Sequence, residues 1–363
     1  MSSPPFRSSP ERMRRGDSAM RRGDSGSGSV LNRVPEDSES ENVDWELEEE
    51  LLLEEQGFYK GSYKRLVALY TLAPLTALLA FALLAVLPHV AYHRPKSHPS
   101  AYPYPAILPF PLPEILASVA LYSLAHLLRN PIYTLSAVLV PFPLAATLIS
   151  TTLHTVLSVV ARLVTLALLL VRHHAAYAYP TWRDTAFRRV WWASLGWAAA
   201  EAVVSVHQGY AGLALYRDVL VPPSPPLTNP ERTPLLPSRR AAPDPDAEID
   251  QDLEELIALK AREELEDVFG LPLIRIPAFI PCLQRVNSPL LSIGLFLLLS
   301  ASQFGARVRW GLVVLATATH LLLAVLHAPI VLPRVGVQGA AYVGAVVSLG
   351  IFFTGLGVWG GVS

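Results

Sequence analysis

Residues 335–363 read VGVQGAAYVGAVVSLGIFFTGLGVWGGVS and contain no Asp, Glu, Lys or Arg. Three further blocks also lack these four residue types, at 66–93, 286–306 and 310–333. An apolar helix of about 20 residues spans the hydrocarbon core of a bilayer, so each block is long enough to cross it. We therefore expect an all-α, polytopic bundle of transmembrane helices that contacts the lipid bilayer directly.

The composition supports this fold class. Of the 363 residues, 52% are hydrophobic and 16% are charged, whereas soluble domains carry about 25% charged residues. A net charge of −1 gives no field to attract nucleic acid, and we expect no nucleic-acid partner. The single cysteine, Cys282, excludes an intrachain disulfide and a multi-cysteine zinc site. We predict neither a metal nor a cofactor.

The apolar pattern predicts about seven spans. Pro74 predicts a kink in the first span, and Arg129-Asn130-Pro131 interrupts the second, because proline disfavours helix interiors. The second is therefore broken or partly re-entrant, and three spans with tight turns over 113–171 are the alternative. The predicted spans are 66–90, 113–140, 143–171, 187–213, 288–305, 309–332 and 335–359.

These spans divide the chain into four parts. A disordered tail covers 1–59, about four spans cover 60–216, a large polar loop covers 217–286, and about three spans cover 287–363. Lys60, Lys64 and Arg65 precede the first span, and the positive-inside rule places them with the tail and the large loop in the cytosol. Several arginines between 172 and 189 would then lie on the non-cytosolic side, against the positive-inside rule. This argues for the alternative of eight spans, in which the large loop lies on the non-cytosolic side.

The tail contains the sequence Met-Arg-Arg-Gly-Asp-Ser twice, at 13–18 and 20–25. Two arginines precede Ser18 and Ser25 at a spacing that suits a basophilic kinase, and Glu41 follows Ser38 as an acidophilic kinase requires. We interpret these three serines as candidate phosphorylation sites. The alternative is a solvated low-complexity repeat, because the segment is too polar to bury a core.

The large loop contains two features. Glu231, followed by Leu235 and Leu236 in a proline-rich stretch, resembles the acidic dileucine signal that clathrin adaptors read. Such a signal would direct the protein to an endosome or vacuole. Residues 247–269 predict an amphipathic helix with nine acidic residues, and its apolar stripe would pack on the protein's own cytosolic face or on a cytosolic partner.

A polar cluster is expected inside the membrane. Spans 143–171 and 187–213 form a predicted antiparallel hairpin, which brings Glu201 within reach of the long side chain of Arg162. His154 and His207, with Gln208 beside them, would form a second level. Charged groups are costly in hydrocarbon, so the Arg162–Glu201 pair is either a structural ion pair or part of a proton or solute path.

Two further patterns occur in the last spans. His320 and His327 share a helix face, which indicates polar packing because no nearby carboxylate or thiol completes a metal site. Gly336, Ala340, Gly344 and Ser348 recur every four residues and predict a face where helices approach closely. This face could pack within the chain or between two copies. No H-E-x-x-H, phosphate-binding loop or G-x-S-x-G motif is present, so we expect no enzyme activity.

Two stretches, WWASLGWAAAEAVVSVHQGY at 191–210 and GLPLIRIPAFIPCLQRVNSPLLSIG at 270–294, are similar to segments of uncharacterised fungal multi-pass membrane proteins. The resemblance implies a fungal endomembrane address, in the vacuole or in the ER, Golgi or endosome. Two functions remain open. The first is a non-enzymatic membrane scaffold or adaptor, and the alternative is a proton-coupled or small-solute transporter that uses Arg162 and Glu201.

Overall fold

The computed structural model describes residues 52–53, 57–91, 111–221, 245–304 and 308–362. The side chains of 245–252 and of residue 255 are not described. The description below concerns the compact unit Leu53–Ser363. The three candidate phosphorylation sites and the Glu231–Leu236 motif lie outside the described residues.

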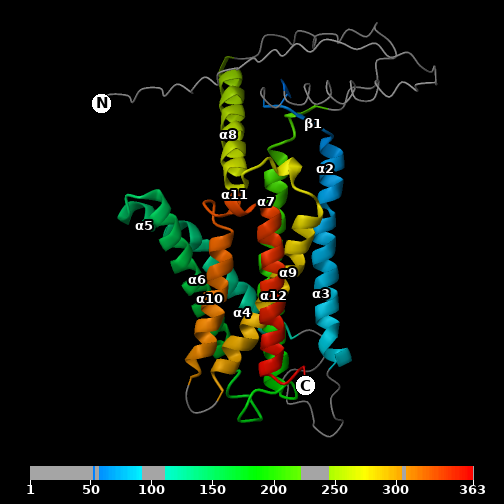
Figure 1. The fold of residues 1–363 in the computed structure, drawn as a ribbon, viewed down its shortest axis with the longest axis vertical. Helices are drawn as coiled ribbons and strands as arrows, with labels where there is room; N and C mark the ends of the chain where they lie inside the picture. The colour runs from blue at the N-terminus through cyan, green and yellow to red at the C-terminus, as the bar shows by residue number, and fades with distance from the viewer. Residues whose placement is uncertain (1–51, 54–56, 92–110, 222–244, 305–307, 363) are drawn as a thin grey trace, which may run out of the picture. The chain divides into compact units, whose positions relative to one another are not determined.

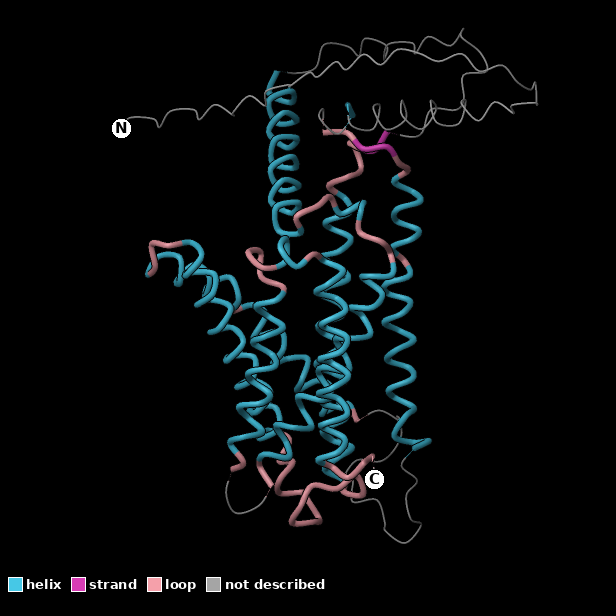
Figure 2. Tube along the Cα trace, in the orientation of Figure 1, coloured by secondary structure: helices cyan, strands magenta, loops and turns pink. Residues whose placement is uncertain are grey.

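The described chain is helical apart from two short strands, which confirms the all-α prediction (Figures 1 and 2). Strand β1 (Tyr59–Lys60) pairs in parallel with β2 (Leu220–Val221). The helices are α2 (Tyr63–Tyr70), α3 (Leu72–Ala91), α4 (Leu112–Leu127), α5 (Arg129–Leu139), α6 (Pro143–Leu168), α7 (Thr185–Ala214), α8 (Pro245–Phe269), the 3₁₀ turn η1 (Leu273–Arg275), α9 (Phe279–Ser302), α10 (Trp310–Leu326), α11 (Leu332–Val335) and α12 (Val337–Val358).

Five helical segments are long and apolar enough to cross a membrane: Tyr63–Ala91, Leu112–Leu139, Pro143–Leu168, Phe279–Ser302 and Val337–Val358. The chain is therefore a multi-pass membrane protein. Two predicted spans are not among the five. Helix α10 is apolar but only 17 residues long, and the 30-residue α7 contains Arg188, Arg189 and Glu201. Helix α7 packs against α3, α4 and α9, which shelter its polar groups.

The two ends of the bundle are named here after the aromatic residues that make contact at each of them. At the tyrosine end, the rings of Tyr59 and Tyr216 lie 6.0 Å apart, before α2 and after α7. At the tryptophan end, the backbone N–H of Trp182 donates to the carbonyl of Trp359 at 2.8 Å. The segment before the first span and the C-terminal end of α12 therefore lie at opposite ends (Figure 1). An odd number of crossings, such as the predicted seven, produces this arrangement.

Prolines divide two of the candidate spans. Thr71 separates α2 from α3, because Pro74 has no N–H to donate to the carbonyl of Tyr70. Leu128 separates α4 from α5, because Pro131 cannot donate to Leu127 in the same way. The prediction of one broken segment before α6 is confirmed. Helix α5 packs along α6 and leans away from the axis of the bundle in Figure 1.

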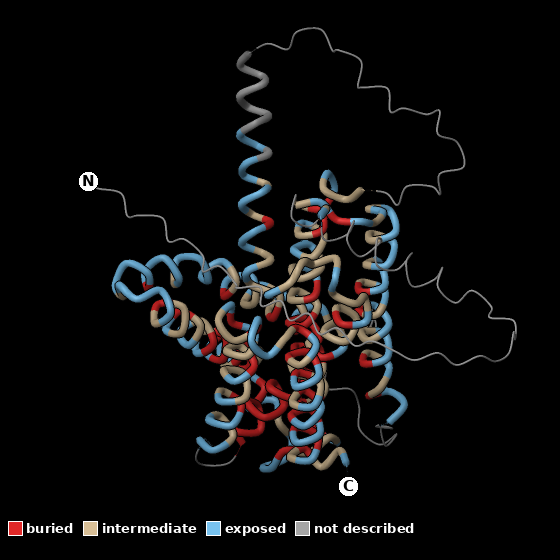
Figure 3. Tube along the Cα trace, turned by 45° about the horizontal axis from the view of Figure 1, so that its top comes forward, coloured by how far each residue is buried: buried red, intermediate tan, exposed pale blue. Residues whose placement is uncertain are grey.

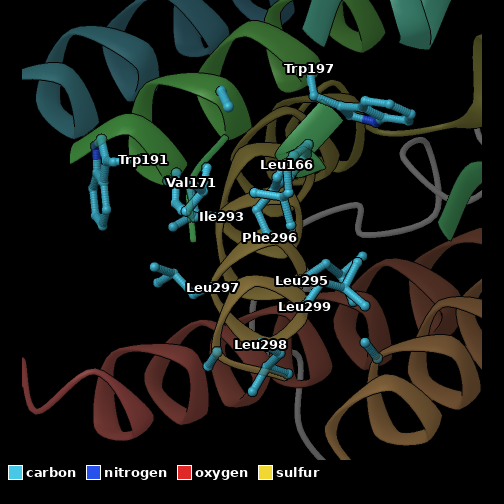
Figure 4. Close-up of a cluster of buried hydrophobic side chains, with 14 of the residues drawn as sticks. Leu166, Val171, Trp191, Trp197, Ile293, Leu295, Phe296, Leu297, Leu298 and Leu299 are labelled. Atoms are coloured by element: carbon cyan, nitrogen blue, oxygen red, sulfur yellow. The ribbon is translucent and has the colours of Figure 1, made fainter. Parts of the chain in front are cut away.

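Helix α9 forms the centre of the core. Every residue from Ser292 to Ser302 is buried, and α3, α7, α10 and α12 pack around this helix. Figure 4 shows Phe296 of α9 beside Leu166 of α6, and the ring centres of Phe296 and Trp197 of α7 lie 5.9 Å apart. Exposed leucines instead cover the outer faces of α3 and α5, where Leu78 is 68% and Leu139 is 70% exposed (Figure 3). These faces are the ones that lipid would cover.

Small residues bring α9 and α12 into close contact. Ala340, Gly344 and Ser348 are buried on α12, which confirms the predicted packing face and shows that it serves contact within the chain. The side-chain amide of Asn287 donates to the carbonyl of Ala341 at 3.2 Å across this contact. Gly336 does not continue the face, because it lies in the turn before α12 with φ of 79°.

Candidate functional site: a buried polar cluster

Arg162 of α6 is the most enclosed charged group inside the bundle that the sequence singles out. Its side chain is only 2% exposed. Nη1 donates to the hydroxyl of Ser158 at 2.6 Å and makes a longer contact to the Ser158 carbonyl at 3.3 Å. The guanidinium lies 4.3 Å from the ring centre of Trp197 and 5.9 Å from that of Phe296. Aromatic faces on α7 and α9 therefore stabilise this cation.

The predicted partner of Arg162 is close but does not touch it. Among the described side chains, no direct ion pair joins Arg162 to Glu201. Glu201 instead influences the charge of Arg162 from a distance, and it lies beside the hydroxyls of Ser288 and Ser292 and within the field of Arg285. Each group thus lies within the electrostatic influence of the other, while the direct contact that the sequence suggested is not formed.

The histidines near Arg162 come from α4, α6 and α10. His154 of α6 lies in the fields of Arg129, His126 and Arg162, and His320 of α10 lies in the fields of Arg162 and His154. Helices α6 and α10 pack directly together, which explains this arrangement. His207 and Gln208 are exposed on α7, and neither is among the groups that influence His154. The imidazoles in electrostatic range of His154 are therefore His126 of α4 and His320 of α10.

The sequence pattern grouped His320 with His327, because the two histidines share a helix face, and did not link His320 to His154. The Nδ1 atom of His327 lies 2.9 Å from the carbonyl of Leu323, at the end of α10. This contact fits the predicted polar packing for His327. His320 could be assigned to the cluster only once the packing of α10 on α6 was known.

Five buried side-chain atoms, distributed along the bundle, have no hydrogen-bond partner within the described protein: His154 Nδ1, Arg162 Nε, Arg285 Nε, Ser288 Oγ and His320 Nδ1. A buried polar group without a partner costs about 1–3 kcal/mol. Lipid tails offer no donor or acceptor, so the bilayer cannot compensate this cost. These five atoms are therefore available to water or to a polar ligand.

A cleft opens at the tryptophan end, close to the cluster. Its volume is about 520 Å³, and it lies between the last turns of α6, the residues that follow α6, and the end of α9. Leu166 lies in the cleft, one helical turn after Arg162. No acidic residue is among the residues that line the cleft: Leu166, Ala167, Leu170, Val171, Arg172, His173 and Gln303.

A buried ion pair that the sequence did not predict stabilises the tryptophan end. Arg189 Nε of α7 lies 3.7 Å from Glu114 Oε1 of α4, and both side chains are less than 10% exposed. Arg189 Nη1 also donates to the carbonyl of Leu169 at 3.2 Å. Both α4 and α7 begin at the tryptophan end, and this shared start is the signal that could have revealed the pair.

At the tyrosine end, polar contacts fix the base of α8. The hydroxyl of Tyr216 donates to Glu266 at 2.8 Å and accepts from the backbone N–H of Leu273 at 3.1 Å. The hydroxyl of Tyr59 donates to the same carboxylate at 3.1 Å. Burial raises the pKa of Tyr216, and the nearby Glu266 carboxylate adds to this rise.

Beyond this anchored base, the apolar residues of α8 have no cover. Leu253, Leu256 and Ile257 are 55%, 62% and 58% exposed. The predicted helix over 247–269 is confirmed as α8. The stripe at these three residues does not pack on the described part of the chain.

The described residues include no group of three or more His, Cys, Asp or Glu that could hold a metal ion. The chain matches no protein-family model, no curated protein and no solved structure. The fold and the buried cluster thus define a multi-pass membrane protein with an interior polar centre.

Proposed function

We propose that this protein transports a small polar solute through its interior and performs no covalent chemistry. The observation that carries this proposal is the set of buried, unpartnered polar atoms at His154, Arg162 and His320, inside a bundle whose outer surface is apolar. A binding centre for a transported solute needs such atoms, because they exchange water for the solute.

A purely structural role fits the cluster less well. The Glu114–Arg189 pair shows how this chain builds a structural ion pair, with the charges 3.7 Å apart and a further bond to Leu169. In the cluster, Arg162 has no carboxylate in direct contact, and its Nε is left open. This difference favours a site for a ligand over a contact that fixes helix register.

The proposal is tested with the full chain reconstituted in liposomes. Proton and anion fluxes are recorded for the wild type, for Arg162→Met and for Arg183→Met. Arg183 is a matched control because it also lies over a tryptophan ring, at 5.3 Å from Trp182, but is exposed at the tryptophan end. We expect flux in the wild type and the control, and its loss in Arg162→Met. Wild-type flux no faster than in protein-free liposomes would reject transport.

A second function, a membrane scaffold or adaptor, is favoured by the exposed stripe on α8. Acidic residues such as Glu254 and Glu263 accompany the stripe, so its partner would be a cytosolic protein with an apolar and basic helix. A photo-crosslinking residue placed at Leu256 should yield one discrete adduct in intact cells. The same residue at Glu263 is the control. An adduct that persists after Leu253→Ser with Ile257→Ser would speak against this interface.

For the cellular address, we propose a fungal endomembrane, most simply the vacuole. The resemblance at 191–210 and 270–294 and the motif at Glu231, Leu235 and Leu236 support this location. Changing Leu235 and Leu236 to Ala should move a fluorescently tagged protein to the cell surface. An unchanged distribution would show that adaptors do not read this motif.

A further inference from the structure

The donors of the cluster are predominantly groups that bind anions. Two of the five unpartnered atoms are guanidinium N–H groups, on Arg162 and Arg285. Glu201 is the one carboxylate among the groups that influence Arg162. A solute that meets these side chains therefore finds more positive charge and more hydrogen-bond donors than acceptors.

The two arginines lie near opposite ends of the bundle. Arg162 precedes the end of α6 by six residues, so it lies about 9 Å from the tryptophan end of that helix. Arg285 follows the start of α9 by six residues, which places it about 9 Å from the tyrosine end. Glu201 lies in the fields of both. Arg162 is enclosed in the interior, whereas the half-buried Arg285 lies beside Tyr70 of α2.

We infer that Arg162, together with His154 and His320, forms an intramembrane binding site for a small inorganic anion, which enters through the cleft at the tryptophan end. This inference rests on the proposed transport function and names its substrate class. Arg172 lines the cleft and none of the other lining residues is acidic, and a cleft lined by one sign of charge concentrates the opposite ion.

The surroundings of Arg162 strengthen the interaction with an anion. The rings of Trp197 and Phe296 exclude water from one side of the guanidinium, and a charge interaction is stronger in such a low-dielectric site. The Nε–H of Arg162 and one ring N–H from each imidazole are suitable donors to a spherical or planar anion. The carboxylate of Glu201 opposes anion binding, because it repels an anion that approaches Arg162.

The test uses the purified full-length protein in detergent and the emission of Trp197 as the reporter. Chloride replaces gluconate at constant ionic strength. We expect a saturable emission change in the wild type, its loss in Trp197→Phe, and an affinity lowered at least about tenfold in Arg162→Met. Arg183→Met, the exposed arginine–tryptophan pair, should titrate as the wild type does.

Glu201→Gln gives the sharpest result, because it should raise chloride affinity by at least about threefold. Misfolding does not increase affinity, so this variant tests the site even if Arg162→Met fails to fold. A wild type without a saturable change, an unaltered affinity in folded Arg162→Met, or a weaker affinity in Glu201→Gln would each overturn the site. Saturable binding without liposome flux would retain the site and reject transport, whereas flux without chloride binding would reject the site alone.

Discussion

The contact between α9 and α12 makes a quantitative prediction at Gly294. A Cβ atom added at this position would lie 2.7 Å from the carbonyl carbon of Ile351, 2.7 Å from its Cγ2 and 2.8 Å from its carbonyl oxygen. Carbon atoms pack best at about 3.5–4.0 Å, so the two helices must separate by roughly 1 Å. Overpacking of this kind costs about 1–3 kcal/mol. We expect Gly294→Ala to lower the free energy of unfolding by that amount.

The chain provides matched controls on the opposing helix. A Cβ at Gly350, next to Ile351, meets no heavy atom within 4 Å, so Gly350→Ala should be neutral or slightly stabilising. Gly355 is intermediate, because its Cβ would lie 3.0 Å from Leu297 Cβ. Reversible unfolding in detergent with added SDS, followed by tryptophan fluorescence, measures all three variants. Equal stability of Gly294→Ala and Gly350→Ala would refute the close helix contact.

Three further predictions concern the two ends of the bundle. Glu114→Gln should destabilise the fold by about 1–3 kcal/mol, because it removes the carboxylate 3.7 Å from Arg189, and adding Arg189→Met should recover part of that loss in the same SDS assay. Tyr216→Phe should loosen the base of α8 and speed proteolysis of this helix, because the hydroxyl donates one hydrogen bond to Glu266 and accepts another from Leu273. An unchanged cleavage rate would contradict the anchoring role of Tyr216. Burial raises the pKa of Tyr216 above its ordinary 10.0. The protonated hydroxyl therefore contributes its full share of stability below about pH 10, and this contribution declines as the pH rises above that value. In an alkaline unfolding titration, Tyr216→Phe should reduce that decline.

Much of the fold follows from hydropathy and proline positions. Uncharged blocks predict α3, α9 and α12, because lipid tolerates few charges and the helix is the simplest backbone that satisfies its own polar groups there. Pro131 predicts the break between α4 and α5 for a local steric reason. Such features depend on the residue itself and its near neighbours, and a single sequence reveals them.

The composition of the polar cluster could not be predicted in the same way. The sequence suggested Arg162 with Glu201, because consecutive helices form hairpins, but it paired His154 with His207 on that basis. The structure brings His320 to His154 instead, since α10 packs on α6 although many residues separate them. The Glu114–Arg189 pair was missed for the same reason. Contacts between helices distant in sequence depend on the complete packing, and no local pattern encodes them.

The account depends most directly on the claim that the interior around Arg162 and Ser288 is open to water and anions. Cysteine accessibility measures this, in a Cys282→Ser background that removes the one native thiol. A cysteine at Ser288, whose buried hydroxyl lies beside the Glu201 carboxylate, is compared with one at Ser300, whose hydroxyl donates to the carbonyl of Leu297 at 2.9 Å. A water-soluble, anionic thiosulfonate should label position 288 and leave position 300 unmodified. Equal protection of both cysteines would contradict a hydrated polar centre.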